Sequence, residues 1–305
     1  MNFEDLTPPK LPEPINMDVK IQIMTDRDIP VGDRLREAAG WNQTESDWRR
    51  FLTLEPKGCF VACVDGQICG TVTTLNYENR VAWIGMVLVD PAYQRRGIGK
   101  TLLDAGIEYL ERKQVETIKL DATPMGHDLY LQRGFVDEYM IERWEGAAAS
   151  QSEQPADAGP DSDFGPMESA DVTRIFETDR NVFGADRSAL LHSIWKDGPA
   201  FSAAAFAGGG VSGYILGRSG ARAVYLGPWV AHNRSVAEKL FACFLRRASG
   251  AKIFVDVCLE NPHARSIVES VGFQFQRPLT RMYRGSNRYP GKPQFVCGIA
   301  GPELG

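Results

Sequence analysis

The sequence predicts an α/β fold of the α+β kind, built as two related halves in tandem. Three observations support this prediction. Segments with the apolar alternation of half-buried strands are interleaved with segments of helical period. Residues 146–166 consist mainly of small, polar, Pro and Gly residues, which is typical of a linker. The order of the predicted elements before this linker partly recurs after it.

Composition sets limits on the class of protein. The 305 residues suggest two domains, and 43% hydrophobic with 24% charged residues is ordinary for a globular protein. A net charge of -5 and a pI of about 5.5 argue against a nucleic-acid partner. No apolar run is long enough for a membrane span, and residues 1–18 form a proline-containing tail without a signal core. We therefore expect a cytoplasmic protein with neither a membrane nor a nucleic-acid partner.

The cysteines and histidines indicate no metal. None of the six cysteines belongs to a C-x-x-C motif, and Cys59 and Cys63 lie in an apolar run, as buried reduced thiols do. The four histidines are scattered without metal-ligand spacing.

The first half alternates strands and helices in order. Strands are predicted over residues 19–24, 59–64, 68–77, 81–89 and 117–120, with Asp65-Gly66 as a hairpin turn. Helices are predicted over about 25–39, from Thr44 or Ser46 to 54, over 99–113 and around 128–132. The helix over 99–113 should bury one face, formed by Leu102, Leu103, Ile107 and Leu110. Gly134 is placed like a left-handed glycine that ends the last helix.

The second half repeats part of this order. Strands are predicted over residues 222–226 and 253–258, and helices over 235–248 and 262–271. Gly272-Phe273 follows its last helix as Gly134-Phe135 follows the last helix of the first half. The predicted division is a flexible tail (1–18), a first domain (19–145), a linker (146–166), a second domain (167–290) and a C-terminal segment (291–305).

A glycine-containing turn between a strand and a helix carries the clearest chemical signal. The apolar strand ends with Val87, Leu88 and Val89, and a helix follows the turn directly. Free N–H groups at a helix start favour an anion, and glycines let a phosphate approach the backbone. The basic residues of the turn add positive charge. The predicted phosphate-binding residues are Gln94, Arg95, Arg96, Gly97, Ile98, Gly99 and Lys100.

The same segment has a second interpretation. Gly99-Lys100-Thr101 matches the end of the nucleoside-triphosphate motif G-x-x-x-x-G-K-[ST]. That motif requires glycine at position 94, where this chain has Gln94. A third interpretation of this segment is a surface loop that starts a helix and binds no ligand.

The strand, the Gln94–Gly99 turn and the later Leu129-Tyr130 and Gly134-Phe135 together resemble the GNAT acetyltransferase superfamily. The resemblance covers about residues 19–145 well, and about 167–285 look like a degenerate copy. It implies tandem GNAT folds, each with a mixed, mostly antiparallel sheet between helices and a splayed parallel strand pair. It implies that the turn binds the pyrophosphate of acetyl-CoA, and that Met86–Val89 splays from its parallel neighbour to pair with the pantetheine arm.

The implied reaction moves the acetyl group of acetyl-CoA directly to a primary amine of a small molecule. Polarising the thioester needs N–H donors, for which Val87–Val89 are candidates, and the leaving thiolate needs an acid. The resemblance assigns that acid to Tyr130. The base stays open between Glu78, Asp121, His127 and the water-mediated base that the resemblance also implies, although we expect Asp121 to brace the Thr123-Pro124 turn.

Four residues are candidates for contacts with the acceptor amine. An aromatic ring with neighbouring polar groups suits an organic amine. The candidates are Trp41, Asn42, Gln43 and Glu78.

The second half lacks the same features. No glycine-rich turn follows residue 226, and Val268 stands where the first half has Tyr130. We therefore expect a second domain without catalytic activity. A non-catalytic acyl-CoA-binding module and a P-loop nucleotide-binding protein remain the alternatives for the whole chain.

Overall fold

The structure is a computed structural model that describes residues 18–148 and 164–305. Most of the predicted tail and the centre of the predicted linker lie outside these residues. The strands of the first half are β1 (Lys20–Ile23), β2 (Phe60–Val64), β3 (Gln67–Tyr77), β4 (Val81–Val89), β5 (Thr117–Ala122) and β6 (Val136–Ala147). Its helices are α1 (Ile29–Ala38), α2 (Glu45–Leu54), α3 (Ile98–Arg112) and α4 (His127–Leu131).

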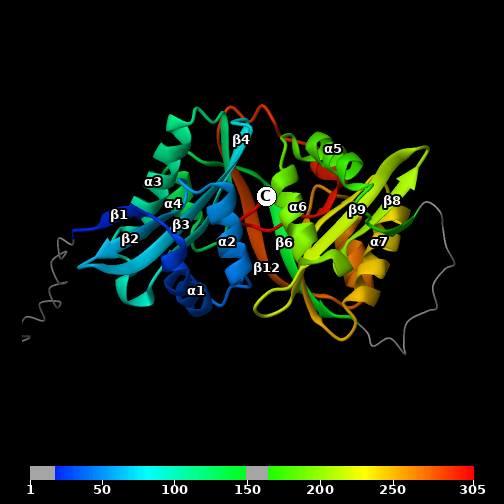
Figure 1. The fold of residues 1–305 in the computed structure, drawn as a ribbon, viewed down its shortest axis with the longest axis horizontal. Helices are drawn as coiled ribbons and strands as arrows, with labels where there is room; N and C mark the ends of the chain where they lie inside the picture. The colour runs from blue at the N-terminus through cyan, green and yellow to red at the C-terminus, as the bar shows by residue number, and fades with distance from the viewer. Residues whose placement is uncertain (1–17, 149–163) are drawn as a thin grey trace, which may run out of the picture.

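The second half has a similar order of elements. Its strands are β7 (Phe164–Pro166), β8 (Ala203–Ala207), β9 (Gly210–Arg218), β10 (Val224–Ala231), β11 (Lys252–Cys258), β12 (Gln274–Gly285) and β13 (Val296–Gly298). Its helices are α5 (Val172–Phe183), α6 (Ser188–Asp197), α7 (Arg234–Arg247) and α8 (Ala264–Ser270). Figure 1 shows the two halves side by side.

All the described strands belong to one mixed sheet. Their order is β1-β2-β3-β4-β5-β12-β6-β11-β13-β10-β9-β8-β7, with an additional pairing of β11 with β10. Only β4 with β5 and β10 with β11 pair in parallel, once in each half. The predicted α+β class, with a mostly antiparallel sheet and one parallel pair in each half, is confirmed.

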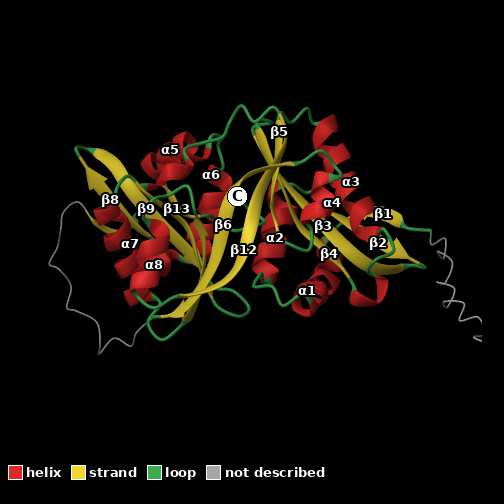
Figure 2. Ribbon diagram, turned by 180° about the vertical axis from the view of Figure 1, so that it is seen from behind, coloured by secondary structure: helices red, strands yellow, loops and turns green. Residues whose placement is uncertain are grey.

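The two halves exchange their last long strands. β12, from the second half of the chain, pairs with β5 over Thr280–Gly285 and also with β6. β6, from the first half, pairs with β11 of the second half from Ile141 to Ala147. β6 and β12 run next to each other at the centre of the molecule (Figures 1 and 2). The domain division expected from the sequence stays a prediction, since the sheet is continuous across it.

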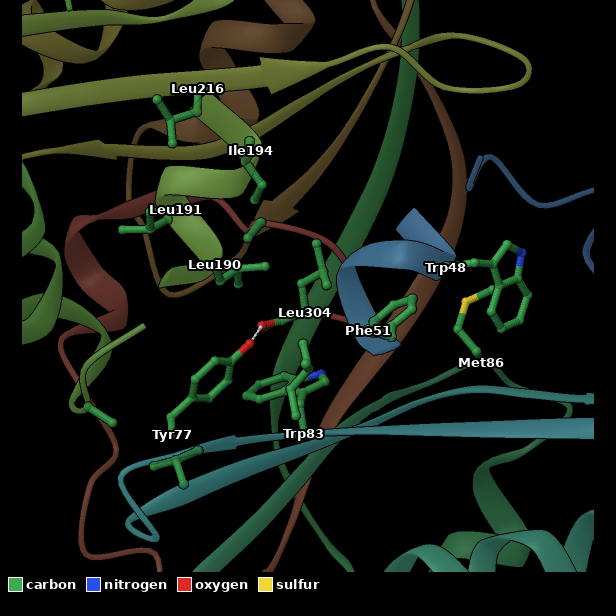
Figure 3. Close-up of a cluster of buried hydrophobic side chains, with 14 of the residues drawn as sticks. Trp48, Phe51, Tyr77, Trp83, Met86, Leu190, Leu191, Ile194, Leu216 and Leu304 are labelled. Carbon is green, nitrogen blue, oxygen red and sulfur yellow. Dashed lines mark hydrogen bonds between the residues drawn. The ribbon is translucent and has the colours of Figure 1, made fainter. Parts of the chain in front are cut away.

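The helices cover the two faces of the sheet differently. On one face, α1 and α2 of the first half and α5 and α6 of the second share a single hydrophobic core. Trp48 and Phe51 on α2 and Leu191 on α6 are completely buried in it (Figure 3). On the other face, α3 covers the first half and α7 with α8 covers the second, each over a separate core. The shared core joins the halves because burial of its large side chains is the main stabilising term.

The end of the chain lies in this shared core. Leu304 is completely buried there, and its carbonyl accepts a hydrogen bond of 2.8 Å from the Tyr77 hydroxyl (Figure 3). Trp83 Nε1 donates to the Pro302 carbonyl at 2.9 Å. Because Tyr77 and Trp83 belong to β3 and β4, the C-terminal segment is fixed against the first half.

Several local predictions are confirmed by the backbone. Thr44 caps α2 in a capping box with Asp47, and Asp65-Gly66 forms the hairpin turn with positive φ angles of 50° and 79°. The Gly134 φ of 77° is left-handed, as expected after α4. The apolar face predicted for α3 is buried. All six cysteines are free and buried, as the sequence suggested.

Candidate active site

The predicted phosphate turn lies between β4 and the start of α3. Gly97 is the N-cap of α3 with a φ of 84°, and Arg95 has a φ of 59°. Gln94 Nε2 donates to the Val89 carbonyl at 3.1 Å, which closes the turn over the end of β4. A Cβ added at Gly97 would meet no atom within 4 Å, so the glycine is required by its backbone angle and leaves open space above the turn.

The backbone N–H groups at the start of α3 are free to donate hydrogen bonds to a ligand. Thr101 N is the first in α3 to reach a carbonyl, that of Gly97 at 3.0 Å. Among the described residues, no carbonyl accepts from the N–H groups of Gly97–Lys100. The turn is exposed, apart from Ile98 and the half-buried Gly99. Such a helix start, with the positive end of the helix dipole, is suited to an anion.

β4 separates from its parallel neighbour next to this turn. Only Val81–Trp83 pair with β5, over Thr117–Lys119. Met86 has a φ of 49°, and the register with β3 shifts between Thr71 and Thr73, so β4 is bent by a bulge. Beyond Trp83 no strand of the described chain pairs with β4 on the β5 side. The gap between the two strands is therefore open at Gly85–Val89.

A pocket opens at this gap, with walls from both halves of the chain. Trp41, Gln43, Tyr130, the β4 residues 84–87 and the end of β5 form one side. Arg143 on β6, Arg277 and Leu279 on β12, and Pro302 and Glu303 of the C-terminal segment form the other. The strand exchange brings β6 and β12 to this position.

Tyr130 is one of the residues that line the pocket. The ring lies on α4 and packs edge-on against Phe135, with centroids 6.1 Å apart. Its hydroxyl has no hydrogen-bond partner within residues 18–148 and 164–305. Burial raises the pKa of Tyr130 to about 12, so the phenol keeps its proton at neutral pH.

The structure separates the four predicted acceptor residues into two groups. Trp41 and Gln43 line the pocket with Tyr130, whereas Asn42 and Glu78 do not. The buried Asn42 amide donates to the Ala223 carbonyl at 3.0 Å and accepts from the N–H groups of 222 and 223, which joins the two halves. Glu78 accepts from Arg180 at 2.6 Å and from the backbone N–H of Asp186 at 2.8 Å.

The other groups considered as bases are also engaged. Both carboxylate oxygens of Asp121 accept from Arg281, at 2.8 and 2.9 Å, so the expected brace of the Thr123-Pro124 turn is wrong. A charged guanidinium 160 residues away competes better for this buried carboxylate than a local N–H does. His127 contacts Asp137 at 2.8 Å.

Glu303 is a pocket carboxylate that the sequence did not reveal. It is 3% exposed and accepts from Arg218 Nη2 at 2.9 Å. Arg218 also contacts Asp47 at 3.0 Å, so this ion pair network connects β9, α2 and the C-terminal segment. Burial raises the pKa of Glu303 from its ordinary value of 4.5, although Arg218 opposes that shift. No local pattern around residue 303 marks it, because its role depends on where the chain end folds back.

Comparison with known families identifies the fold. Residues 30–135 match the acetyltransferase (GNAT) family, and residues 175–298 match an acetyltransferase (GNAT) domain. The chain belongs to the GNAT acetyltransferase superfamily. Its two matches confirm the tandem arrangement, one in each half.

Relatives with full-length similarity support an acyltransferase. The tandem GNAT chain is 25% identical over 269 residues to a holothin acyltransferase from a Pseudoalteromonas species, with 88% of each chain covered. It superposes on a putative acetyltransferase from Pyrococcus horikoshii with a TM-score of 0.77 and 25% identity, covering 94% of this chain and 96% of the other. A tandem GNAT protein from the clavulanic acid biosynthesis pathway has a TM-score of 0.60 at 13% identity, covering 87% and 98%, which shows a shared fold.

The second GNAT half has a corresponding gap that the chain itself fills. β10 and β11 pair in parallel over Val224–Leu226 and then separate. β13 lies between them, with Gly298 opposite both Trp229 and Val257. In the first half the matching gap holds no strand of the described chain.

Two further absences concern the described residues. No helix there is long and apolar enough to cross a membrane. Within the same ranges, no three His, Cys, Asp or Glu side chains gather as they would around a metal ion.

Proposed function

We propose that this tandem GNAT protein transfers the acetyl group of acetyl-CoA to a primary amine of a small molecule. One observation carries the proposal: the edge of β4 that is unpaired on the β5 side runs from the Gln94–Gly99 turn to a pocket that Tyr130 lines. A thioester bound along β4 would present its carbonyl and sulfur to that pocket. The six buried, free cysteines support a reducing compartment such as the cytoplasm.

The turn and strand would hold the donor. The N–H groups of Gly97–Lys100, with the exposed side chains of Arg95, Arg96 and Lys100 nearby, suit the pyrophosphate. The edge of Val87–Val89 on the β5 side, which pairs with no strand of the described chain, suits the pantetheine amides. One of the N–H groups of this edge would polarise the thioester carbonyl.

Two pocket residues would move the protons. Tyr130 would donate to the departing CoA sulfur, because burial keeps the phenol neutral. Glu303 would accept the proton of the attacking amine, because Arg218 donates to only one of its carboxylate oxygens, whereas Arg281 occupies both oxygens of Asp121. Among the described lining residues there is no cysteine or serine, which supports direct transfer without an acyl-enzyme.

The proposal is tested by CoA-thiol release from acetyl-CoA with a panel of small amines and lysine peptides. Tyr130→Phe should lower kcat by about 10²-fold or more, the usual contribution of a general acid. Tyr289→Phe is a matched control, because that hydroxyl contacts Glu116 at 3.1 Å and lies outside the pocket.

Two results would decide against acetyl transfer, and a third would decide against Tyr130 as the acid. Thermal stabilisation by acetyl-CoA without thiol release for any amine would indicate a binding module. Stabilisation by ATP and not by CoA would support the nucleotide-binding alternative. Full activity of Tyr130→Phe across the pH range would remove Tyr130 as the acid.

A further inference from the structure

Arg277 is a pocket cation without a partner. It lies on β12, where its Cα pairs with that of Arg143 on β6. Its Nε is buried and has no acceptor, and no carboxylate of the described chain forms an ion pair with it. The residue as a whole is half-buried. A buried N–H group without an acceptor is costly, because it has lost its hydrogen bond to water.

The neighbouring arginines are all paired. Arg143 binds Asp256 through two hydrogen bonds, and Arg281 binds Asp121 in the same way. Arg218 is bound by Glu303 and Asp47. The carboxylates near Arg277 are therefore hydrogen-bonded to other arginines, and none of them bonds directly to Arg277 in the described chain. Burial and the charge of Arg143 lower the pKa of Arg277, although the charges of Asp256 and Glu303 oppose that shift.

The pocket also contains a hydrogen-bond acceptor that has no donor. Gln43 is 8% exposed and lines the pocket, and its Oε1 has no donor among the described residues. The pocket thus presents a cationic N–H donor on β12 and an amide acceptor in the loop after α1. A ligand that carries both an anionic group and an N–H group would satisfy both atoms.

We propose that the acceptor is an amino acid or related aminocarboxylate, whose carboxylate binds Arg277 and whose amine lies near Gln43 and Glu303. A guanidinium matches a carboxylate through two parallel hydrogen bonds, and this geometry fixes orientation as well as charge. Holding the carboxylate on β12 would direct the amine across the pocket to the open edge of β4. This inference rests on the proposed acetyl transfer and adds the substrate class.

The test compares matched acceptors with the whole protein. Thiol release is measured for a set of amino acids, their carboxamides and the corresponding decarboxylated amines. We expect kcat/KM to be roughly 10- to 100-fold higher for the carboxylates, the range of one or two charged hydrogen bonds. Arg277→Met should abolish that preference by slowing the carboxylates alone. Arg234→Met, which removes an exposed arginine on α7 paired with Glu238, should keep it.

Stability gives an independent measure of Arg277. Because the guanidinium has no partner in the described chain, Arg277→Met should leave the melting temperature unchanged or raise it. A clear fall would show that Arg277 is structural and would overturn the inference. Equal turnover of carboxylates and decarboxylated amines, or a preference for phosphorylated amines, would also overturn it while leaving acetyl transfer intact. No turnover with any amine would instead count against the proposed function itself.

Discussion

A methyl group added to Gly85 tests whether the C-terminal segment forms a wall of the active site. Gly85 lies on β4 beside the open gap, and the segment crosses directly above it. A Cβ at this position would be 2.7 Å from Glu303 Cβ and 2.9 Å from Glu303 Cα. Carbon atoms pack best about 3.5–4.0 Å apart, so Gly85→Ala must move the segment or β4 by about an ångström.

The magnitude follows from what holds the segment in place. Its hydrogen bonds from Tyr77 and Trp83 contribute about 0.5–1.5 kcal/mol each. Burial of Leu304 contributes about 1.5–3 kcal/mol more. Releasing the segment would therefore cost about 2.5–6 kcal/mol, whereas overpacking by one methyl group costs about 1–3 kcal/mol. The segment should stay bound in a shifted position, with a loss of about 1–3 kcal/mol of unfolding free energy.

The measurement combines urea unfolding with thiol-release kinetics. The shift displaces Pro302 and Glu303, so kcat/KM should fall roughly tenfold or more, since a misplacement of about 1 Å can cost about 10²-fold. Gly106→Ala is the control, because its Cβ would meet side-chain carbons at 3.5 Å and alanine favours the helix by up to about 1 kcal/mol. If Gly85→Ala matched the wild type in both assays, the segment would not lie against β4.

Two further predictions concern the proton acceptor and the phosphate turn. Glu303 acts as a base only when ionised, and burial raises its pKa above 4.5, so kcat/KM should fall as the pH drops through that raised pKa. Glu303→Gln should lose this acidic limb and about 10²-fold in rate, and an unchanged pH profile would exclude Glu303 as the base. Gly97→Val places a β-branched residue at a φ of 84°, so it should raise the KM for acetyl-CoA. Gly106→Ala, which lies inside α3 and away from the turn, should not. Unchanged acetyl-CoA affinity of Gly97→Val would move the pyrophosphate site elsewhere.

The sequence could predict what depends on neighbouring residues. The strand before Gln94, the glycine-containing turn that leads into a helix and the apolar stripe of α3 are local patterns, and the structure contains each of them. Thr44 and Gly134 mark the ends of helices through contacts within a few residues. These features could be predicted because the residues that form each of them are close together in the sequence.

The remaining parts of the site depend on distant contacts. β12 contains no signal that it will pair with β5 instead of remaining in the second half. Arg277 and Glu303 reach the pocket only through that pairing and through the return of the chain end. Asn42 seemed suited to a ligand because of its residue type, but its amide is satisfied by residues about 180 positions later in the chain.

The strand exchange also has a consequence for synthesis of the protein. When the ribosome has completed β6, the first half still lacks the strand that lies beside β5, and both β5 and β6 present unpaired backbone edges. The Asp121–Arg281 pair, 160 residues apart, cannot form until β12 emerges. Neither half can complete its sheet by itself, so the two halves should fold cooperatively and only after β12 has been synthesised. Until then, the exposed strand edges should be prone to aggregation. Separate expression of the halves should yield insoluble chains, whereas co-expression could restore the sheet.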